Sequence, residues 1–201
     1  MANLLHDIIG TEGNELSGKR IVLGVTGSVS AYHAPDIARM LMRHGADVFV
    51  VMSEMAQQII HPNLMEWATG NPVVTQLTGR IEHVTLTAGP TKADLILIAP
   101  CTANTISKIA CGIDDTPVTS CVSSAFGGHL PIVIAPAMHR TMYQHPLVVE
   151  NIRKLVGLGV VFVQPKEEEE KAKLASPEVI LRSILHILTP KDLEEKKPRA
   201  R

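Results

Sequence analysis

The chain from residue 20 to residue 30 reads RIVLGVTGSVS, and this stretch decides the fold. Residues 21–25 form a short apolar run, which is typical of a strand buried on both faces of a sheet. Gly27 then allows a tight turn. The hydroxyl groups of Ser28 and Ser30 follow where a helix would expose its free backbone N–H groups. We therefore predict a buried strand whose carboxyl end leads through a tight turn into a helix.

Similar apolar runs recur along the chain, and helical patterns separate them. The further strands are predicted at residues 47–52, 94–99, 131–135 and 160–163. Apolar residues at helical spacing predict helices at residues 34–43, 104–110, 147–156 and 177–188. Strands that alternate with helices form a parallel sheet covered on both faces. The pattern therefore predicts an α/β protein with a three-layer, doubly wound, Rossmann-like sheet.

A single domain of this kind accounts for residues 19–190. Residues 1–18 are polar and punctuated by glycine, which predicts an N-terminal arm with one helical turn. Residues 191–201 are charged and interrupted by proline, which predicts a frayed C-terminal tail. The glutamate-rich residues 166–171 predict a solvated face or a flexible loop.

The composition excludes several classes of protein. The 201 residues carry a formal net charge of −1 and are 45% hydrophobic, which argues against a disordered chain and against a basic nucleic-acid-binding protein. No apolar run is long enough to span a membrane. The three cysteines and nine histidines show neither a disulfide framework nor zinc-ligand spacing, so no metal is expected. An odd number of cysteines without a signal peptide predicts a cytoplasmic protein with reduced thiols.

Ligands of a doubly wound sheet bind beyond the carboxyl ends of its strands, where two serine-containing turns are predicted. The turn at Gly27 and Ser28 suits a phosphate, and a serine helix cap accounts equally well for the same residues. Ser53 follows the second strand and either caps the next helix or adds a hydroxyl to that phosphate. The spacing G-x-x-G without a third glycine is not the dinucleotide fingerprint, so a nicotinamide enzyme is not favoured.

Two further polar segments follow later strands. Residues 100–105 combine small residues with hydroxyl and amide side chains, which suits the polar edge of a flat heterocycle. An N-cap formed by a threonine or the asparagine of this segment is the alternative. Residues 136–146 begin and end with proline, which predicts a constrained loop and not a helix. His139 and Arg140 in this loop could bind a carboxylate, with a solvated loop as the alternative.

Taken together and in this order, these segments resemble the flavin-dependent cysteine decarboxylases over residues 18–190. The resemblance is carried by Gly27-Ser28-Val29, by residues 100–105 with their continuation to Asp115, and by the pattern Pro-Ala-Met-x-x-x-Met at residues 136–142. Within this family the chain is similar to the N-terminal decarboxylase half of archaeal-type bifunctional proteins of coenzyme A biosynthesis. This second likeness is carried by residues 67–71, 81–83 and 170–173 and by His139.

The resemblance implies a flavoprotein that uses FMN to decarboxylate 4'-phosphopantothenoylcysteine to 4'-phosphopantetheine. It implies that the FMN phosphate is held by Gly27, Ser28, Val29 and Ser53. It implies that the flavin ring is held by Thr102, Ala103, Asn104, Thr105 and Ala137. It implies that the substrate is bound by Ala137, Met138 and His139. The resemblance gives the catalytic role to His83, for which the spacing of residues alone offers no support. It also implies that the protein forms a homotrimer, or a multiple of trimers, with binding sites shared between subunits.

The chain departs from the family pattern at two places. His139 stands where the family usually has an asparagine that contacts the substrate carboxylate, and an imidazole can donate a hydrogen bond there. Residues 164–175 contain no cysteine, whereas bacterial and plant relatives carry one in this flap. Residues 192–197 resemble the beginning of a ligase half. Two interpretations therefore remain: a stand-alone decarboxylase and a truncated bifunctional protein. A peptidyl-cysteine or pterin substrate and a non-catalytic flavin-binding subunit remain alternative functions.

Overall fold

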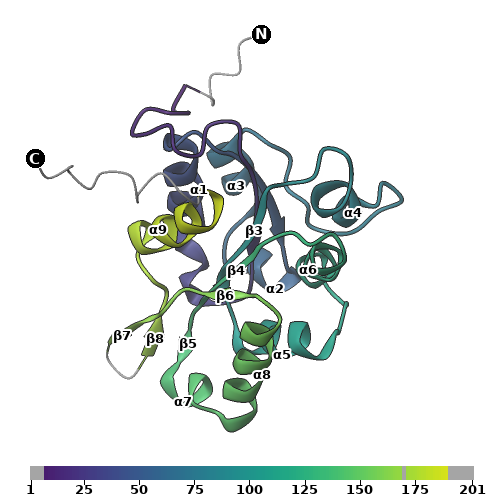
Figure 1. Cartoon of the computed structure of the whole chain (residues 1–201), viewed down its shortest axis with the longest axis vertical. Helices are drawn as coiled ribbons and strands as arrows, with labels where there is room; N and C mark the ends of the chain where they lie inside the picture. The colour runs from purple at the N-terminus through teal and green to yellow at the C-terminus, as the bar shows by residue number, and fades with distance from the viewer. Residues whose placement is uncertain (1–6, 169–170, 190–201) are drawn as a thin grey trace, which may run out of the picture.

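The computed structural model describes residues 7–168 and 171–189, and five parallel strands form the centre of the fold (Figure 1). Neighbouring strands follow the order β2-β1-β3-β4-β6. Their bounds are β1 Arg20–Val25, β2 Asp47–Met52, β3 Leu95–Cys101, β4 Ile132–Pro136 and β6 Val161–Phe162. The five predicted strands and the parallel sheet are confirmed. Chain order reverses between β1 and β3, and such a switch point opens a crevice at the carboxyl ends of the strands.

Helices cover both faces of this sheet, as the alternating pattern predicts (Figure 1). One face packs against α1 Ala34–Arg43, α3 Pro62–Thr69 and α9 Pro177–Leu188. The other packs against α4 Glu82–Thr87, α5 Ala103–Cys111, α6 Pro117–Gly127 and α8 Pro146–Gly157. The central strand β3 is buried along its whole length, which explains its continuous apolar run. None of the helices in the described part of the chain is long and apolar enough to cross a membrane.

A second, smaller sheet lies beside the carboxyl ends of the main strands, and sequence patterns did not predict it. Its order is β5-β8-β7, with bounds β5 Met138–His139, β7 Lys166–Glu168 and β8 Lys171–Lys173. The expected loop at residues 136–146 is therefore wrong in part, because β5 is followed by the short helix α7, Arg140–Tyr143. The glutamate-rich segment forms part of the antiparallel hairpin of β7 and β8. Within β8 the side chain of Ala172 is buried, and the alternation of a strand turns the lysines on either side of it to the opposite face.

The N-terminal residues from 7 to 18 pack against the end of α1 as a series of turns, without the expected helical turn. The backbone N–H of Gly10 donates to the carbonyl of Met42 at 3.0 Å, and that of Leu16 donates to the carbonyl of His44 at 2.9 Å. The Leu16 side chain is fully buried in the core. The predicted C-terminal tail lies outside the described residues.

Candidate functional site

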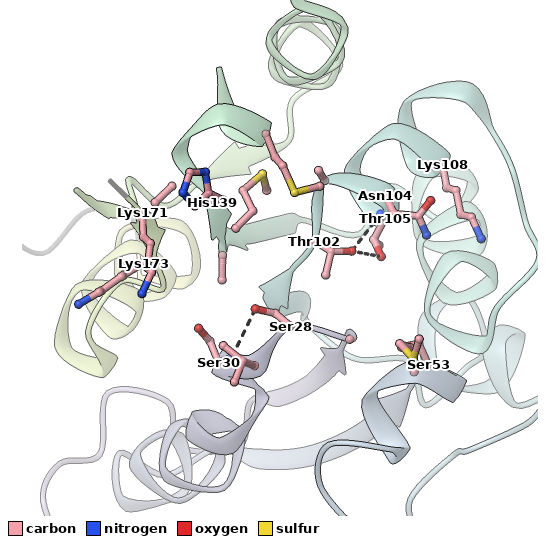
Figure 2. Close-up of a pocket in the computed structure, with 18 of the residues that line it drawn as sticks. Ser28, Ser30, Ser53, Thr102, Asn104, Thr105, Lys108, His139, Lys171 and Lys173 are labelled. Carbon is pink, nitrogen blue, oxygen red and sulfur yellow. Dashed lines mark hydrogen bonds between the residues drawn. The ribbon is translucent and has the colours of Figure 1, made fainter. Parts of the chain in front are cut away.

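A cavity of about 640 Å³ lies at the carboxyl ends of the main strands, next to the small sheet (Figure 2). All of the residues predicted to bind cofactor or substrate line it: Gly27, Ser28, Val29, Ser53, Thr102, Ala103, Asn104, Thr105, Ala137, Met138 and His139. Several other lining residues have no role predicted from the sequence, among them Met55, Lys108, Thr116, Met142, Lys171 and Lys173. The structure thus brings four separate segments together, whereas His83 and Arg140 do not line the cavity.

The turn after β1 forms one wall of the cavity. Ser28 caps the short 3-10 helix η2, Val29–His33, and its Oγ accepts a hydrogen bond from the backbone N–H of Ser30 at 3.3 Å. A Cβ atom at Gly27 would lie 2.5 Å from Cγ of Met55, so only glycine allows this close approach. The cap prediction is confirmed, and the capping hydroxyl also faces the cavity.

Two further hydroxyl caps face the same space. Ser53 caps α2, Glu54–Gln57, and its Oγ accepts from the backbone N–H of Ala56 at 3.2 Å. Thr102 caps α5, and its Oγ1 accepts from the backbone N–H of Thr105 at 3.2 Å. Each cap places a helix N-terminus, with its partial positive charge, at the cavity wall. The capping and ligand-binding interpretations of these segments are therefore compatible.

Thr26 joins two walls of the cavity, and sequence reasoning missed it. Its buried Oγ1 donates to the carbonyl of Pro100 at 2.9 Å and accepts from the backbone N–H of Thr102 at 3.1 Å. These bonds fix the turn after β1 against the start of α5. The signal was available, since Thr26 is the polar residue that directly precedes Gly27 at the end of an apolar strand.

His139 reaches the cavity from β5 and caps α7. Its Nδ1 accepts from the backbone N–H of Thr141 at 3.3 Å and lies 2.8 Å from Oγ1 of Thr141. These bonds hold the ring through Nδ1 and leave Nε2 without a hydrogen-bond partner among the described residues, so Nε2 is the ring nitrogen that can meet a ligand. Arg140 is exposed on the adjoining helix.

His83 lies on α4, which packs against α6 on one face of the main sheet and away from the cavity lining (Figure 1). Its Nδ1 is buried and has no hydrogen-bond partner among the described residues. Hydrogen bonds from the side chain and backbone of Thr78 lower the pKa of the adjacent Glu82 to about 2, so Glu82 stays charged and anchors the start of α4. The preceding Ile81 has a left-handed backbone with φ of 48°, a strained conformation for a β-branched residue.

The thiol groups of Cys101 and Cys121 are not suited to nucleophilic chemistry. Cys101 ends β3 and Cys121 lies in α6, and both are buried without a disulfide. Burial raises the pKa of the Cys101 thiol, and burial together with nearby carboxylates raises that of Cys121 to about 12. Both groups therefore stay protonated at neutral pH, and neither offers the thiolate that a reactive cysteine requires.

Comparison with known proteins supports the predicted family. The flavoprotein family model matches residues 9–189. A coenzyme A biosynthesis bifunctional protein, CoaBC, of Thermococcus kodakarensis is 59% identical over 192 residues, which cover 94% of this chain and 47% of that protein. The chain thus spans about half the length of this curated relative. A probable phosphopantothenoylcysteine decarboxylase of Streptococcus mutans is 37% identical and is matched over 74% of this chain and 83% of its own length.

A solved structure shows the same arrangement of elements. The FMN-dependent cysteine decarboxylase SpaF superimposes with a TM-score of 0.76 at 32% sequence identity, over 86% of this chain and 98% of that one. The family model extends over nearly all of the described fold, including the four segments that line the cavity. The chain therefore belongs to the flavoprotein family.

Proposed function

We propose that this protein is an FMN-dependent decarboxylase that converts 4'-phosphopantothenoylcysteine to 4'-phosphopantetheine in coenzyme A biosynthesis. The observation that carries this proposal is the convergence of four motif segments on one cavity at the carboxyl ends of the strands. The relatives support the reaction, since their names are those of coenzyme A biosynthesis proteins and of a probable phosphopantothenoylcysteine decarboxylase.

The cavity has the features that FMN requires. Hydroxyl caps and backbone N–H groups at Ser28 and Ser53 suit a phosphate, and they lie near a glycine that no side chain could replace without displacing Met55. Small residues and the polar groups of residues 102–105 suit the edge of a flat heterocycle. When bound, FMN supplies the two-electron oxidation and reduction that this conversion needs.

The conversion breaks one carbon–carbon bond and is redox-neutral overall. The substrate carboxylate leaves as carbon dioxide, and the carbon that carried it takes up one proton. His139 donates its Nε2–H toward the carboxylate, and Ala137 and Met138 shape the wall beside it. His83 handles a proton during the oxidation of the cysteine group, a role in which histidine is the side chain used most often.

The site is completed by a second copy of the chain. His83 is absent from the cavity of its own chain, while apolar side chains at the cavity remain exposed. Val29 is 77% exposed, Met55 is 56% exposed and Met142 is 50% exposed. Exposed apolar groups of this kind mark an interface. The assembly is a homotrimer or a multiple of trimers in which one subunit supplies His83 to its neighbour's cavity.

The protein acts in the cytoplasm, a reducing compartment that keeps cysteines such as those of this chain as free thiols.

The identity and anchoring of the cofactor test this proposal. Cofactor released by heat is expected to have the mass of FMN, because the cavity has one phosphate-binding turn and no second nucleotide fingerprint. Ser28→Ala is expected to weaken FMN binding by about 1 kcal/mol or somewhat more, through loss of one hydrogen bond to a charged group. Titration of apoprotein with FMN measures this change, and Ser183→Ala, on the exposed side of α9, is the matched control. Release of FAD, or unchanged affinity in Ser28→Ala, would contradict the assignment.

A further inference from the structure

A lysine on the wall that suits the flavin ring has no role in the proposed reaction. Lys108 lies on α5 one turn after Asn104, so the two side chains share the face of the helix that lines the cavity. Figure 2 shows both of them beside Thr105, with His139 and the small sheet across the cavity. Among the described residues, the other charged side chains that line the cavity are those of Glu54 on α2 and of the lysines of β8. Lys108 is therefore the charged residue of the wall that suits the ring.

Asp115 holds the ammonium group of Lys108 in place. Oδ2 of Asp115 lies 2.6 Å from Nζ of Lys108, and the lysine side chain is 23% exposed while that of the aspartate is 50% exposed. The backbone N–H of Asp115 donates to Oγ1 of Thr119 at 3.2 Å, which ties the aspartate to the capping box of α6. Lys108 lines the cavity and Asp115 does not, so the positive end of the pair is the one nearer to a ligand. An ammonium group has three N–H donors, and the pair leaves part of them available.

We infer that Lys108, oriented by Asp115, stabilises the reduced form of bound FMN and so raises the midpoint potential of the flavin. The isoalloxazine ring gains a negative charge when it takes up two electrons and one proton, and a nearby cation favours the charged form of a group. Charge placed beside the ring is one of the ways in which a protein tunes the electronics of a flavin. Lys108 would therefore favour the reduced ring over the oxidised one.

This inference rests on the proposed function, in which the cysteine group of the substrate is first oxidised and its electrons are later returned. The cysteine group loses two electrons and two protons as its carbon–sulfur bond becomes a double bond. Both electrons and one proton go to the flavin, and the other proton goes to His83. A higher potential favours this first half of the reaction and opposes the return of the electrons, so Lys108 sets the balance between the two halves.

The pairing with Asp115 distinguishes this role from the recruitment of a phosphate. At a distance the ammonium and carboxylate charges largely cancel, so the pair attracts a remote anion weakly. A ring in contact with the wall is nearer to the ammonium group, and there the positive charge dominates. Loss of Lys108 would leave the carboxylate uncompensated, and loss of the Asp115 charge would leave the ammonium group uncompensated. The two losses should therefore shift the potential of the flavin in opposite directions.

The test measures the midpoint potential of the FMN-loaded protein by reduction together with a reference dye. We expect Lys108→Met to reduce the preference for reduced over oxidised FMN about 10-fold, which is a fall of about 30 mV for a two-electron couple. Asp115→Asn should raise the potential, and the double variant should lie between the two single ones. The matched control is Lys154→Met, because Nζ of Lys154 donates to the carbonyl of Ala110 at 2.6 Å at the far end of α5, away from the cavity lining. Its potential should be that of the wild type.

Two results would overturn the inference. An unchanged potential in Lys108→Met would show that the ammonium group does not act on the ring. Shifts of the same sign in Lys108→Met and Asp115→Asn would show that the pair only holds the wall in shape. If Lys108→Met does not retain FMN, Asp115→Asn decides, and a potential equal to or below that of the wild type contradicts the inference. The measurement needs no substrate, so a wild type that binds FMN but leaves 4'-phosphopantothenoylcysteine intact would contradict the proposed reaction alone.

Discussion

Replacing His83 by asparagine is expected to abolish decarboxylation while leaving the fold and the bound flavin in place. Proton transfer by a positioned side chain contributes about 10²-fold to 10⁴-fold to a rate, and an asparagine amide cannot take up or release a proton near pH 7. The flavin should remain because the residues proposed to hold its phosphate and ring lie in other segments, at 27–29, 53, 102–105 and 137. Product formation under single-turnover conditions, together with the flavin absorption spectrum, measures both effects.

A second histidine provides the matched control for this substitution. His61 caps α3 through a hydrogen bond from the backbone N–H of Asn63 to its Nδ1, and asparagine is itself a good N-cap. His61→Asn should therefore keep full activity. Near-normal turnover in His83→Asn would show that His83 is structural, and a loss of flavin from His83→Asn would show that the variant acts through the cofactor.

Two inactive variants are expected to restore activity when they assemble together. His83→Asn lacks the proton-transfer group, and Ser28→Asp lacks cofactor, because a carboxylate beside the phosphate turn repels the phosphate. Aspartate is a good N-cap, so the turn after β1 should keep its conformation in this second variant. If one subunit supplies His83 to its neighbour's cavity, random mixing in a closed ring leaves about one quarter of the sites intact.

Co-expression of the two variants with different tags, followed by sequential purification on both tags, isolates the mixed assemblies. We expect mixed trimers to show about one third of the activity of the wild type, because each mixed ring of three has one intact site, and the value of about one quarter applies to the mixture before the unmixed rings are removed. Assemblies of either variant alone serve as controls and should be inactive. Mixed assemblies without activity, or a monomer by light scattering at micromolar concentration, would contradict the shared site.

The central sheet and the cavity could be predicted because buried strands and capped turns leave local signals. The run at residues 21–25 and the glycine after it indicated both a strand and a ligand-binding turn, and the structure bears out both the strand and the turn. The hydroxyls of Ser28 and Thr102 were ambiguous between caps and ligand contacts. The structure shows both hydroxyls as helix caps that also line the cavity, so the two interpretations are compatible.

Other features lacked such a signal. Helix α6 is rich in serine, threonine and valine, which are weak helix formers. Its start is marked by the capping box of Thr116 with Thr119 and by Pro117 at the first helical position, but no strong helical pattern follows. The hairpin of β7 and β8 depends on pairing across a turn and on the burial of Ala172, which alternation over three residues cannot establish. The position of His83 depends on how α4 packs against α6, a tertiary contact that no local pattern encodes.

Product analysis tests the central claim most directly. FMN-loaded protein, incubated with 4'-phosphopantothenoylcysteine without oxygen, is expected to release one carbon dioxide for each substrate consumed. The thiol product should have the mass of 4'-phosphopantetheine, because the electrons removed from the cysteine group are returned to it. An enethiol with two fewer hydrogen atoms, or substrate recovered intact, would contradict the proposed reaction.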